Sequence, residues 1–276
     1  MREIEPGARE DTELALLFDA ILRLYHYDFR SYAQASLRRA VARARAALGC
    51  ETTTQLLDRI VHQPAVFVAL LRYLTINTSE LFRDPEYFRA MREDVLPHLA
   101  TYPSIRLWVA GCGAGEEAYS FAILLHEENL LERSLIYATD IDLECLRSAA
   151  AGVYPLRRMR DFTENYYAAG GRRSLSDHYT SGYTNAVFAP LLRRRILFSD
   201  HSLATDAGFA EVQLISCRNV LIYFQQPLQD RAIAMFVDSL SPRGFLGLGS
   251  QETLSFCTHA ASFEPFLRDL AIYRRR

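Results

Sequence analysis

The sequence contains no lysine, because every one of the 31 basic residues in its 276-residue chain is arginine. This absence excludes two large classes of enzyme. A Walker-type nucleotide-binding loop needs a lysine that reaches the phosphates. An enzyme that forms a Schiff base, as with pyridoxal phosphate, needs a lysine amine. Kinase-like and pyridoxal chemistry are therefore not expected.

Paired cysteines, long apolar runs and a large net charge are also missing. The five cysteines are scattered without a C-x-x-C spacing, which argues against a disulfide framework and against a thiolate metal site. No apolar run reaches membrane-spanning length, and the charged N-terminus is unlike a signal peptide. The net charge of −2 offers no basic stripe for nucleic acid. We expect a cytoplasmic monomer without metal, nucleic acid or membrane insertion.

The stretch that is most informative runs from Ile105 to Ser120. It opens with an apolar run typical of a buried parallel strand, and an apolar-periodic helix follows from Ala118 to Leu125. Between them stand three glycines, Gly111, Gly113 and Gly115. Because glycine lets the backbone bend sharply and approach a ligand closely, this strand, turn and helix predict one arm of a nucleotide-binding unit.

The spacing and charge of this turn differ from the dinucleotide fingerprint G-x-G-x-x-G. The glycines here follow G-x-G-x-G, and Glu116 stands where the third glycine would fall. Carboxylates at a helix start repel a pyrophosphate but suit a cation, such as the sulfonium and amino-acid tail of S-adenosylmethionine. The alternative is an ordinary glycine-rich turn between a strand and a helix.

A second strand, Leu135 to Asp142, ends in acidic residues. Asp140 lies 25 residues after Gly115, close to the spacing at which an acid reaches the ribose hydroxyls of a bound nucleoside. The alternative is that Asp140 or Asp142 only caps the following helix. The pair provides one acid for each role.

Helical periodicity predicts an all-helical domain over residues 1–70, with helices Thr12–Leu24, Ser36–Leu48 and Thr54–Leu74. The second helix carries four arginines opposite its apolar side, Arg38, Arg39, Arg43 and Arg45. They form either a solvated face or a docking face for an acidic partner. The polar groups that follow, Asn77, Ser79 and Arg83, lie where two domains meet, which favours a ligand site, with a helix cap as the alternative.

Strands and helices alternate over residues 71–276, which predicts a doubly wound α/β sheet. The alternation is interrupted at about residues 155–195, where glycines, aromatic residues and β-branched residues around Gly182 predict an inserted antiparallel β-subdomain. The fold class expected is therefore α/β with a Rossmann-like sheet, a small helical N-terminal domain and an inserted antiparallel β-subdomain.

Four motifs together resemble the CheR family of chemoreceptor-glutamate methyltransferases: Asn77-Thr-Ser-Glu-Leu-Phe-Arg-Asp84, Ala110-Gly-Cys-Gly-Ala-Gly-Glu-Glu117, Ala138-Thr-Asp-Ile-Asp142 and Cys217-Arg-Asn-Val-Leu-Ile-Tyr-Phe224. The resemblance runs from about Leu16 to Gly249, and Ser250-Gln-Glu252 resembles the family's serine–glutamate close. It implies a class I methyltransferase domain that binds S-adenosylmethionine and releases S-adenosylhomocysteine. The sequence departs from the family at Ser79, where threonine is usual, and at Ser202, where asparagine is usual. The inserted hairpin, with which some members bind the tail peptide of a receptor, also differs, so the resemblance does not imply this binding here.

The resemblance also implies site residues. With the turn glycines included, the predicted cofactor-binding residues are Asn77, Ser79, Arg83, Gly111, Gly113, Glu116, Asp140, Ser202, Leu203, Arg218 and Asn219. Tyr223 falls where the family places a tyrosine beside the transferred methyl group. Arg218 either orients the acceptor acid or holds backbone, and we list both residues as catalytic candidates.

The implied reaction transfers a methyl group to glutamate side chains in the cytoplasmic region of a chemoreceptor, which gives methyl esters. A glutamate with a pKa near 4.3 is already ionised at pH 7, so no strong general base is required. Two alternatives remain. One is carboxyl methylation of a signalling protein outside chemotaxis, and the other is a docking protein that senses the cofactor without turnover.

Overall fold

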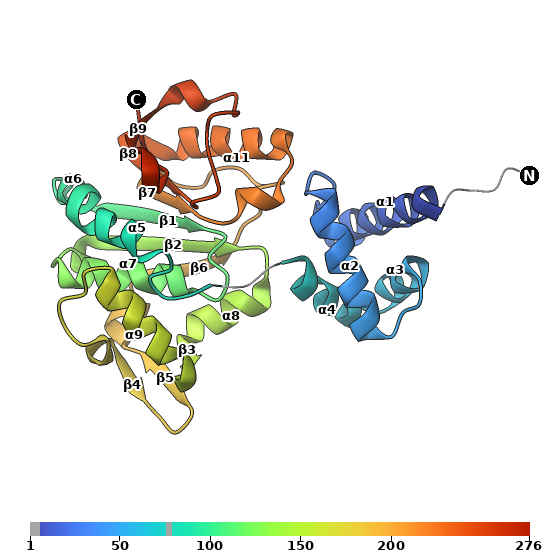
Figure 1. Ribbon diagram of the computed structural model, residues 1–276, viewed down its shortest axis with the longest axis horizontal. Coiled ribbons are helices and arrows are strands. Elements are labelled where there is room, and N and C mark those ends of the chain that lie inside the picture. Colours follow the sequence, from blue (N-terminus) through green and yellow to red (C-terminus); the bar gives the residue numbers. More distant parts are fainter. Residues whose placement is uncertain (1–5, 76–78) are drawn as a thin grey trace, which may run out of the picture. The chain divides into compact units, whose positions relative to one another are not determined.

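The computed structural model describes residues 6–75 and 79–276, which divide into two compact units (Figure 1). The first unit comprises the described residues of Met1–Ile76 together with Ser202–Ala207 and Ile222–Ala232. The second comprises those of Asn77–His201 with Gly208–Leu221 and Ile233–Arg276. Among the described residues, no helix is both long enough and apolar enough to cross a membrane.

The first unit is built from helices α1 (Pro6–Tyr25), α2 (Gln34–Leu48), α3 (Thr53–His62) and α4 (Pro64–Leu74). The prediction of a single helix over Thr54–Leu74 is wrong. The helix is interrupted between α3 and α4 at Gln63, where the backbone is extended. Pro64 has no N–H to donate into a continuing helix, so it begins a new one instead.

In the second unit, seven strands of the described chain form one sheet in the order β6-β2-β1-β7-β8-β10-β9. The strands are β1 (Ile105–Ala110), β2 (Ser134–Asp140), β6 (Ile196–Asp200), β7 (Val212–Cys217), β8 (Leu240–Leu248), β9 (Phe263–Leu267) and β10 (Ile272–Arg275). The first five run parallel, and β10 pairs antiparallel with both β8 and β9. This arrangement confirms the predicted α/β fold class.

Helices cover both faces of this sheet, so its central strands are buried on both sides. The unit's helices are α5 (Pro85–Ala90), α6 (Leu96–Leu99), α7 (Glu116–Glu127), α8 (Leu143–Ala151), α9 (Met159–Ala168), α10 (Pro190–Arg193) and α11 (Gln226–Ser239), the last shared with the first unit. Figure 1 shows α7 and α11 on opposite sides of the sheet. Leu107 and Val109 belong to the core that includes α7, whereas Trp108 packs edge-on against Phe236 of α11.

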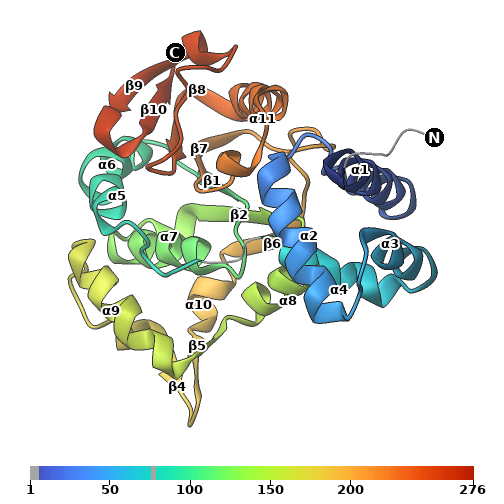
Figure 2. The same cartoon turned by 45° about the vertical axis from the view of Figure 1, so that its right-hand side comes forward.

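A smaller antiparallel sheet, in the order β3-β5-β4, lies between α8 and β6 in the sequence. Its strands are β3 (Val153–Pro155), β4 (Tyr179–Ser181) and β5 (Asn185–Phe188). Figure 2 shows this sheet together with α9 below the main sheet. Stacking of Phe188 on Tyr119 of α7, with ring centroids 4.6 Å apart, joins the small sheet to the core of the unit.

A buried polar cluster joins the C-terminal end of α7 to the insertion. The Glu127 carboxylate contacts Arg92 at 2.6 Å and His178 at 3.7 Å, and it accepts a short hydrogen bond from the Tyr166 hydroxyl. Burial raises the pKa of Glu127, but His178, Tyr166 and Arg92 outweigh burial and bring this pKa down to about 2. The folded protein therefore keeps the Glu127 carboxylate ionised at pH values well below those at which a glutamate is usually protonated.

We predict that this carboxylate makes the folded state sensitive to acid. Because the folded pKa is depressed, its contribution to stability is complete above pH ~4.5 and is lost as pH falls toward 2. Urea unfolding of Glu127→Gln should show lower stability than wild type at pH 7 and a smaller further loss between pH 5 and 2.5. Glu132→Gln, at a side chain that is 87% exposed, is the control. Parallel pH profiles for Glu127→Gln and wild type would contradict the prediction.

Candidate functional site

The glycine turn after β1 bends in a way that only glycine adopts easily. All three glycines have positive φ, with 73° at Gly111 and 91° at Gly115. A Cβ on Gly111 would lie 2.4 Å from Cγ2 of Val220, and one on Gly115 would lie 2.8 Å from Cβ of Ala149. Both positions therefore combine a left-handed backbone with a close approach by another segment.

Asp140 ends β2 directly beside this turn. Its carboxylate accepts hydrogen bonds from the N–H of Gly113 at 2.8 Å and of Asp142 at 2.9 Å. Burial raises the pKa of Asp140, and these two hydrogen bonds oppose that rise. Asp142 is the helix cap, since it accepts from Glu144 and Cys145 at the start of α8. The two acids thus have separate structural roles, and a ribose contact by Asp140 stays a prediction.

Glu116 begins α7 and is almost completely buried, with 1% of its surface exposed. Its Oε1 contacts Arg158 at 2.7 Å, while its Oε2 has no hydrogen-bond partner among the described residues. Burial raises the pKa of Glu116, and Arg158 opposes this effect. A buried carboxylate oxygen without a partner is costly. This oxygen is suited to a cationic donor such as the ammonium group of an amino-acid tail.

Side chains from other segments hold the segment Ser79–Asp84 in place, among them Asn165, which donates to the Leu81 carbonyl at 3.2 Å. The Phe82 N–H donates to the Ser120 hydroxyl at 2.8 Å, Arg158 donates to the Ser79 carbonyl, and Arg218 donates to the Arg83 carbonyl at 3.0 Å. Phe82 and Asp84 have φ of 52° and 54°, a left-handed conformation that is unfavourable for phenylalanine and tolerated by aspartate. Asn77 lies outside the described residues.

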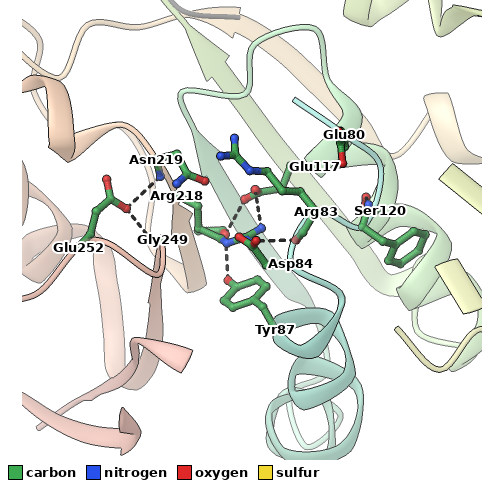
Figure 3. A network of polar contacts seen from close by, with 12 residues as sticks. Glu80, Arg83, Asp84, Tyr87, Glu117, Ser120, Arg218, Asn219, Gly249 and Glu252 are labelled. Carbon is green, nitrogen blue, oxygen red and sulfur yellow. Dashed lines mark hydrogen bonds and ion pairs between the residues drawn. The ribbon is translucent and has the colours of Figure 1, made fainter. Parts of the chain in front are cut away.

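Arg218 lies at the centre of a polar network (Figure 3), and 1% of its side chain is exposed. Its guanidinium contacts Glu117 at 3.1 Å and Asp84 at 2.5 Å, and its Cζ lies 4.1 Å above the Tyr87 ring. Burial lowers the pKa of Arg218, but Glu117, Tyr87 and Asp84 raise it further than burial lowers it. Both terminal nitrogens donate to protein groups, and only its Nε has no partner among the described residues. The geometry therefore favours holding backbone over orienting an acceptor acid.

The remaining predicted residues fall into both units. Asn219 lies beside Arg218 in the second unit and has φ of 59°. Ser202, Leu203 and Tyr223 belong to the first unit. The Ser202 N–H donates to the Asp206 carboxylate at 2.9 Å, and the Tyr223 carbonyl accepts from Ala33 at 2.7 Å. The second unit thus brings together the glycine turn, Asp140, Glu116, Ser79, Arg83, Arg218 and Asn219.

Sequence reasoning missed the residues that hold these groups. They are Ser120, Arg158, Glu117, Tyr87, Asp206 and Glu252, each of which bonds to or packs against a predicted site residue or its segment. Glu117 and Glu252 stood within quoted motifs but without a role. Arg158 contacts Glu116, which lies 42 residues away in the sequence, and no local sequence pattern predicts such a pair.

Comparison with known proteins is consistent with this fold and this site. A seven-stranded sheet of this order, with a glycine turn after its first strand and an acid at the end of the second, defines the class I methyltransferases. The model of the CheR methyltransferase SAM-binding domain matches residues 77–267, and that of the CheR methyltransferase all-alpha domain matches residues 12–75.

Two relatives extend the match. The chain is 51% identical over 265 residues to a Pseudomonas putida protein named "Putative methyltransferase Cher3", which covers 96% of this chain and 97% of that one. It is 34% identical over 190 residues to a chemotaxis protein methyltransferase of Listeria innocua, which covers 68% of each chain. The protein belongs to the CheR methyltransferase family, and S-adenosylmethionine is its cofactor.

We predict that Asp140→Ala weakens cofactor binding more than Asp142→Ala does. The first change removes the acceptor of the Gly113 N–H inside the turn, whereas the second removes a helix cap, worth about 1 kcal/mol of stability. Calorimetry with S-adenosylhomocysteine should show the dissociation constant of Asp140→Ala raised about tenfold or more. Equal affinities for Asp140→Ala and wild type would contradict this role.

Proposed function

We propose that the protein methylates glutamate side chains in the cytoplasmic region of a chemoreceptor and that it does so in the cytoplasm. The observation that carries the proposal is the buried Glu116 oxygen beside the glycine turn, which lacks a partner among the described residues and is suited to the cofactor's ammonium group. Family membership and the chemotaxis protein methyltransferase named above support the choice of acceptor.

For the proposed reaction, the protein has to bind and orient the cofactor and the acceptor and to exclude water. When bound, S-adenosylmethionine supplies a methyl group on a positively charged sulfur. The acceptor glutamate is already an anion at pH 7, so no side chain has to remove a proton. Water stabilises the separated ions more than the transition state, in which charge is cancelled. A site that excludes water therefore favours transfer.

We assign the predicted residues as follows within this proposal. Ser79, Arg83, Glu116, Asp140 and Asn219, with Asn77 and the backbone at Ser202 and Leu203, bind the cofactor beside Gly111 and Gly113. Tyr223 aims the acceptor carboxylate or contacts the sulfonium methyl group. Arg218 acts through the backbone that it holds, because its guanidinium is committed to Glu117, Asp84 and the Arg83 carbonyl.

The arginine-rich side of α2 supports an acidic acceptor. Of its four arginines, Arg38 contacts Asp11 and Arg45 donates to the Glu51 carbonyl. Arg39 and Arg43 are exposed one helical turn apart, and neither has an ion pair or hydrogen bond among residues 6–75 and 79–276. Two unpaired guanidinium groups at this spacing suit a helix that carries carboxylates on one side.

Two other functions remain to be separated from this one. A docking protein that senses the cofactor would bind S-adenosylmethionine without turnover. A carboxyl methyltransferase outside chemotaxis would transfer the methyl group to another signalling protein and leave chemoreceptors unlabelled.

We predict that the protein transfers labelled methyl groups from S-adenosylmethionine to membranes that contain chemoreceptors. The label should be released as volatile methanol by mild alkali, because a carboxyl methyl ester is hydrolysed by base. Receptors whose cytoplasmic glutamates are changed to alanine are the control and should stay unlabelled. A base-stable product would indicate methylation of nitrogen, and cofactor binding without transfer would favour a docking protein.

We predict that Tyr223→Phe reduces turnover more than cofactor affinity. Loss of one hydroxyl that aims the carboxylate removes a hydrogen bond to a charged group, which should lower kcat about tenfold. The dissociation constant for S-adenosylhomocysteine should change little. Tyr183→Phe, at a fully exposed tyrosine, is the matched control. If turnover and cofactor affinity fall together in Tyr223→Phe, the residue has a structural role instead.

A further inference from the structure

The turn Arg218–Val220, which follows β7, is held by carboxylates from two other segments (Figure 3). Glu117 comes from α7 and contacts the turn through Arg218, whose Nη1 lies 3.1 Å from Glu117 Oε2. Glu252 comes from the loop after β8 and contacts the turn through its backbone. Glu252 has 8% of its surface exposed, so it acts in a largely dry environment.

Glu252 accepts hydrogen bonds from three backbone N–H groups. Its Oε2 lies 2.9 Å from the nitrogen of Asn219 and 2.6 Å from that of Gly249, and its Oε1 lies 2.9 Å from that of Val220. The carboxylate therefore connects the segments that follow β7 and β8. Only an ionised carboxylate presents acceptors alone on both oxygens, whereas an amide of the same shape would turn an NH₂ group toward N–H donors.

The backbone at this point has an uncommon conformation. Asn219 has φ of 59°, in the left-handed region, which asparagine adopts more readily than most residues that have a Cβ. The packing is also close, since a Cβ on Gly249 would lie 2.8 Å from Glu252 Oε2 and 2.9 Å from the Asn219 nitrogen. Charge-assisted hydrogen bonds to two successive N–H groups fix the turn in this conformation.

The position of this turn bears directly on the glycine turn. Cγ2 of Val220 lies 2.4 Å from where a Cβ of Gly111 would stand, so the Val220 side chain packs directly on the Gly111 backbone. Displacement of Val220 would therefore change the surroundings of Gly111. On the other side, Glu117 Oε1 accepts from the Ser216 hydroxyl at 2.6 Å, which fixes the carboxylate that faces Arg218.

We propose that Glu252 is a positioning residue for cofactor binding, which holds Asn219 and Val220 against the glycine turn, and that Glu117 supports the same turn through Arg218. This inference rests on the proposed placement of S-adenosylmethionine beside Gly111. It does not depend on which acceptor is methylated.

The test compares Glu252→Gln with wild type and with Glu264→Gln, a change at an exposed glutamate of β9. We expect Glu252→Gln to raise the dissociation constant for S-adenosylhomocysteine about tenfold or more, because three N–H groups lose a charged acceptor. Hydrogen exchange should become faster in peptides that contain Asn219 and Val220. Glu264→Gln should match wild type in both measurements.

Each outcome bears on the proposal. If Glu252→Gln lowers the melting temperature but leaves the affinity for S-adenosylhomocysteine and the exchange of Val220 unchanged, Glu252 is only structural and the proposal is overturned. If Glu252→Gln does not fold, Glu117→Gln decides, because it keeps the acceptor for Ser216 and loses the charge that faces Arg218. A wild-type affinity in Glu117→Gln would then overturn the proposal. Failure to methylate receptors, with normal S-adenosylhomocysteine binding in wild type, would refute the proposed function alone.

Discussion

The contact between Gly111 and Val220 is the constraint on which the described part of the site depends. Two turns that follow neighbouring parallel strands, β1 and β7, approach so closely that the Val220 side chain occupies the space a side chain at position 111 would need. Parallel strands bring their carboxyl ends to one edge of the sheet, and ligands of such sheets bind there. The approach of these two turns requires glycine at position 111, which also has a left-handed backbone, and Asn219 in the facing turn is left-handed as well.

In a chain without lysine, arginine forms ion pairs that connect distant segments. Arg92 contacts the neighbouring Glu127 and Glu128, whereas Arg158 and Arg218 each contact a glutamate and a backbone carbonyl from different segments. A planar guanidinium can donate in two directions at once, whereas a lysine ammonium is a compact point charge. These three arginines connect elements that lie 35 or more residues apart in the sequence.

Much of this fold was predictable because it depends on local patterns. Alternating apolar runs and helical periodicity gave the α/β class, and the turn glycines marked the end of β1. The interruption of the helix at Gln63 was not predicted although Pro64 indicates it, because the apolar periodicity continues across the proline. The domain boundaries and the cofactor contacts stay predictions, since no ligand geometry tests the roles given to Ser79, Arg83 or Tyr223.

The roles of the supporting residues could not be predicted from the sequence for a different reason. Glu252 accepts from Asn219 and Val220 across more than thirty positions, and its place in the motif Ser250-Gln-Glu252 does not indicate this contact. Its role appears only when β7 and β8 are paired, because that pairing brings Gly249 and Asn219 together. Long-range hydrogen bonds to backbone leave little trace in composition or periodicity.

Two adjacent glutamates at the start of α7 show how one short motif can carry two different functions. Glu116 and Glu117 both lie near the positive end of the helix dipole, which favours carboxylates at that position. Both carboxylate oxygens of Glu117 accept hydrogen bonds from protein groups, Ser216 and Arg218, so this residue stabilises the structure around the site. Glu116 uses one oxygen on Arg158 and keeps the other without a partner in the described chain. The same residue type therefore supports the framework at one position and, within the proposed function, provides the charge for a cationic ligand at the next, and only the neighbours decide which.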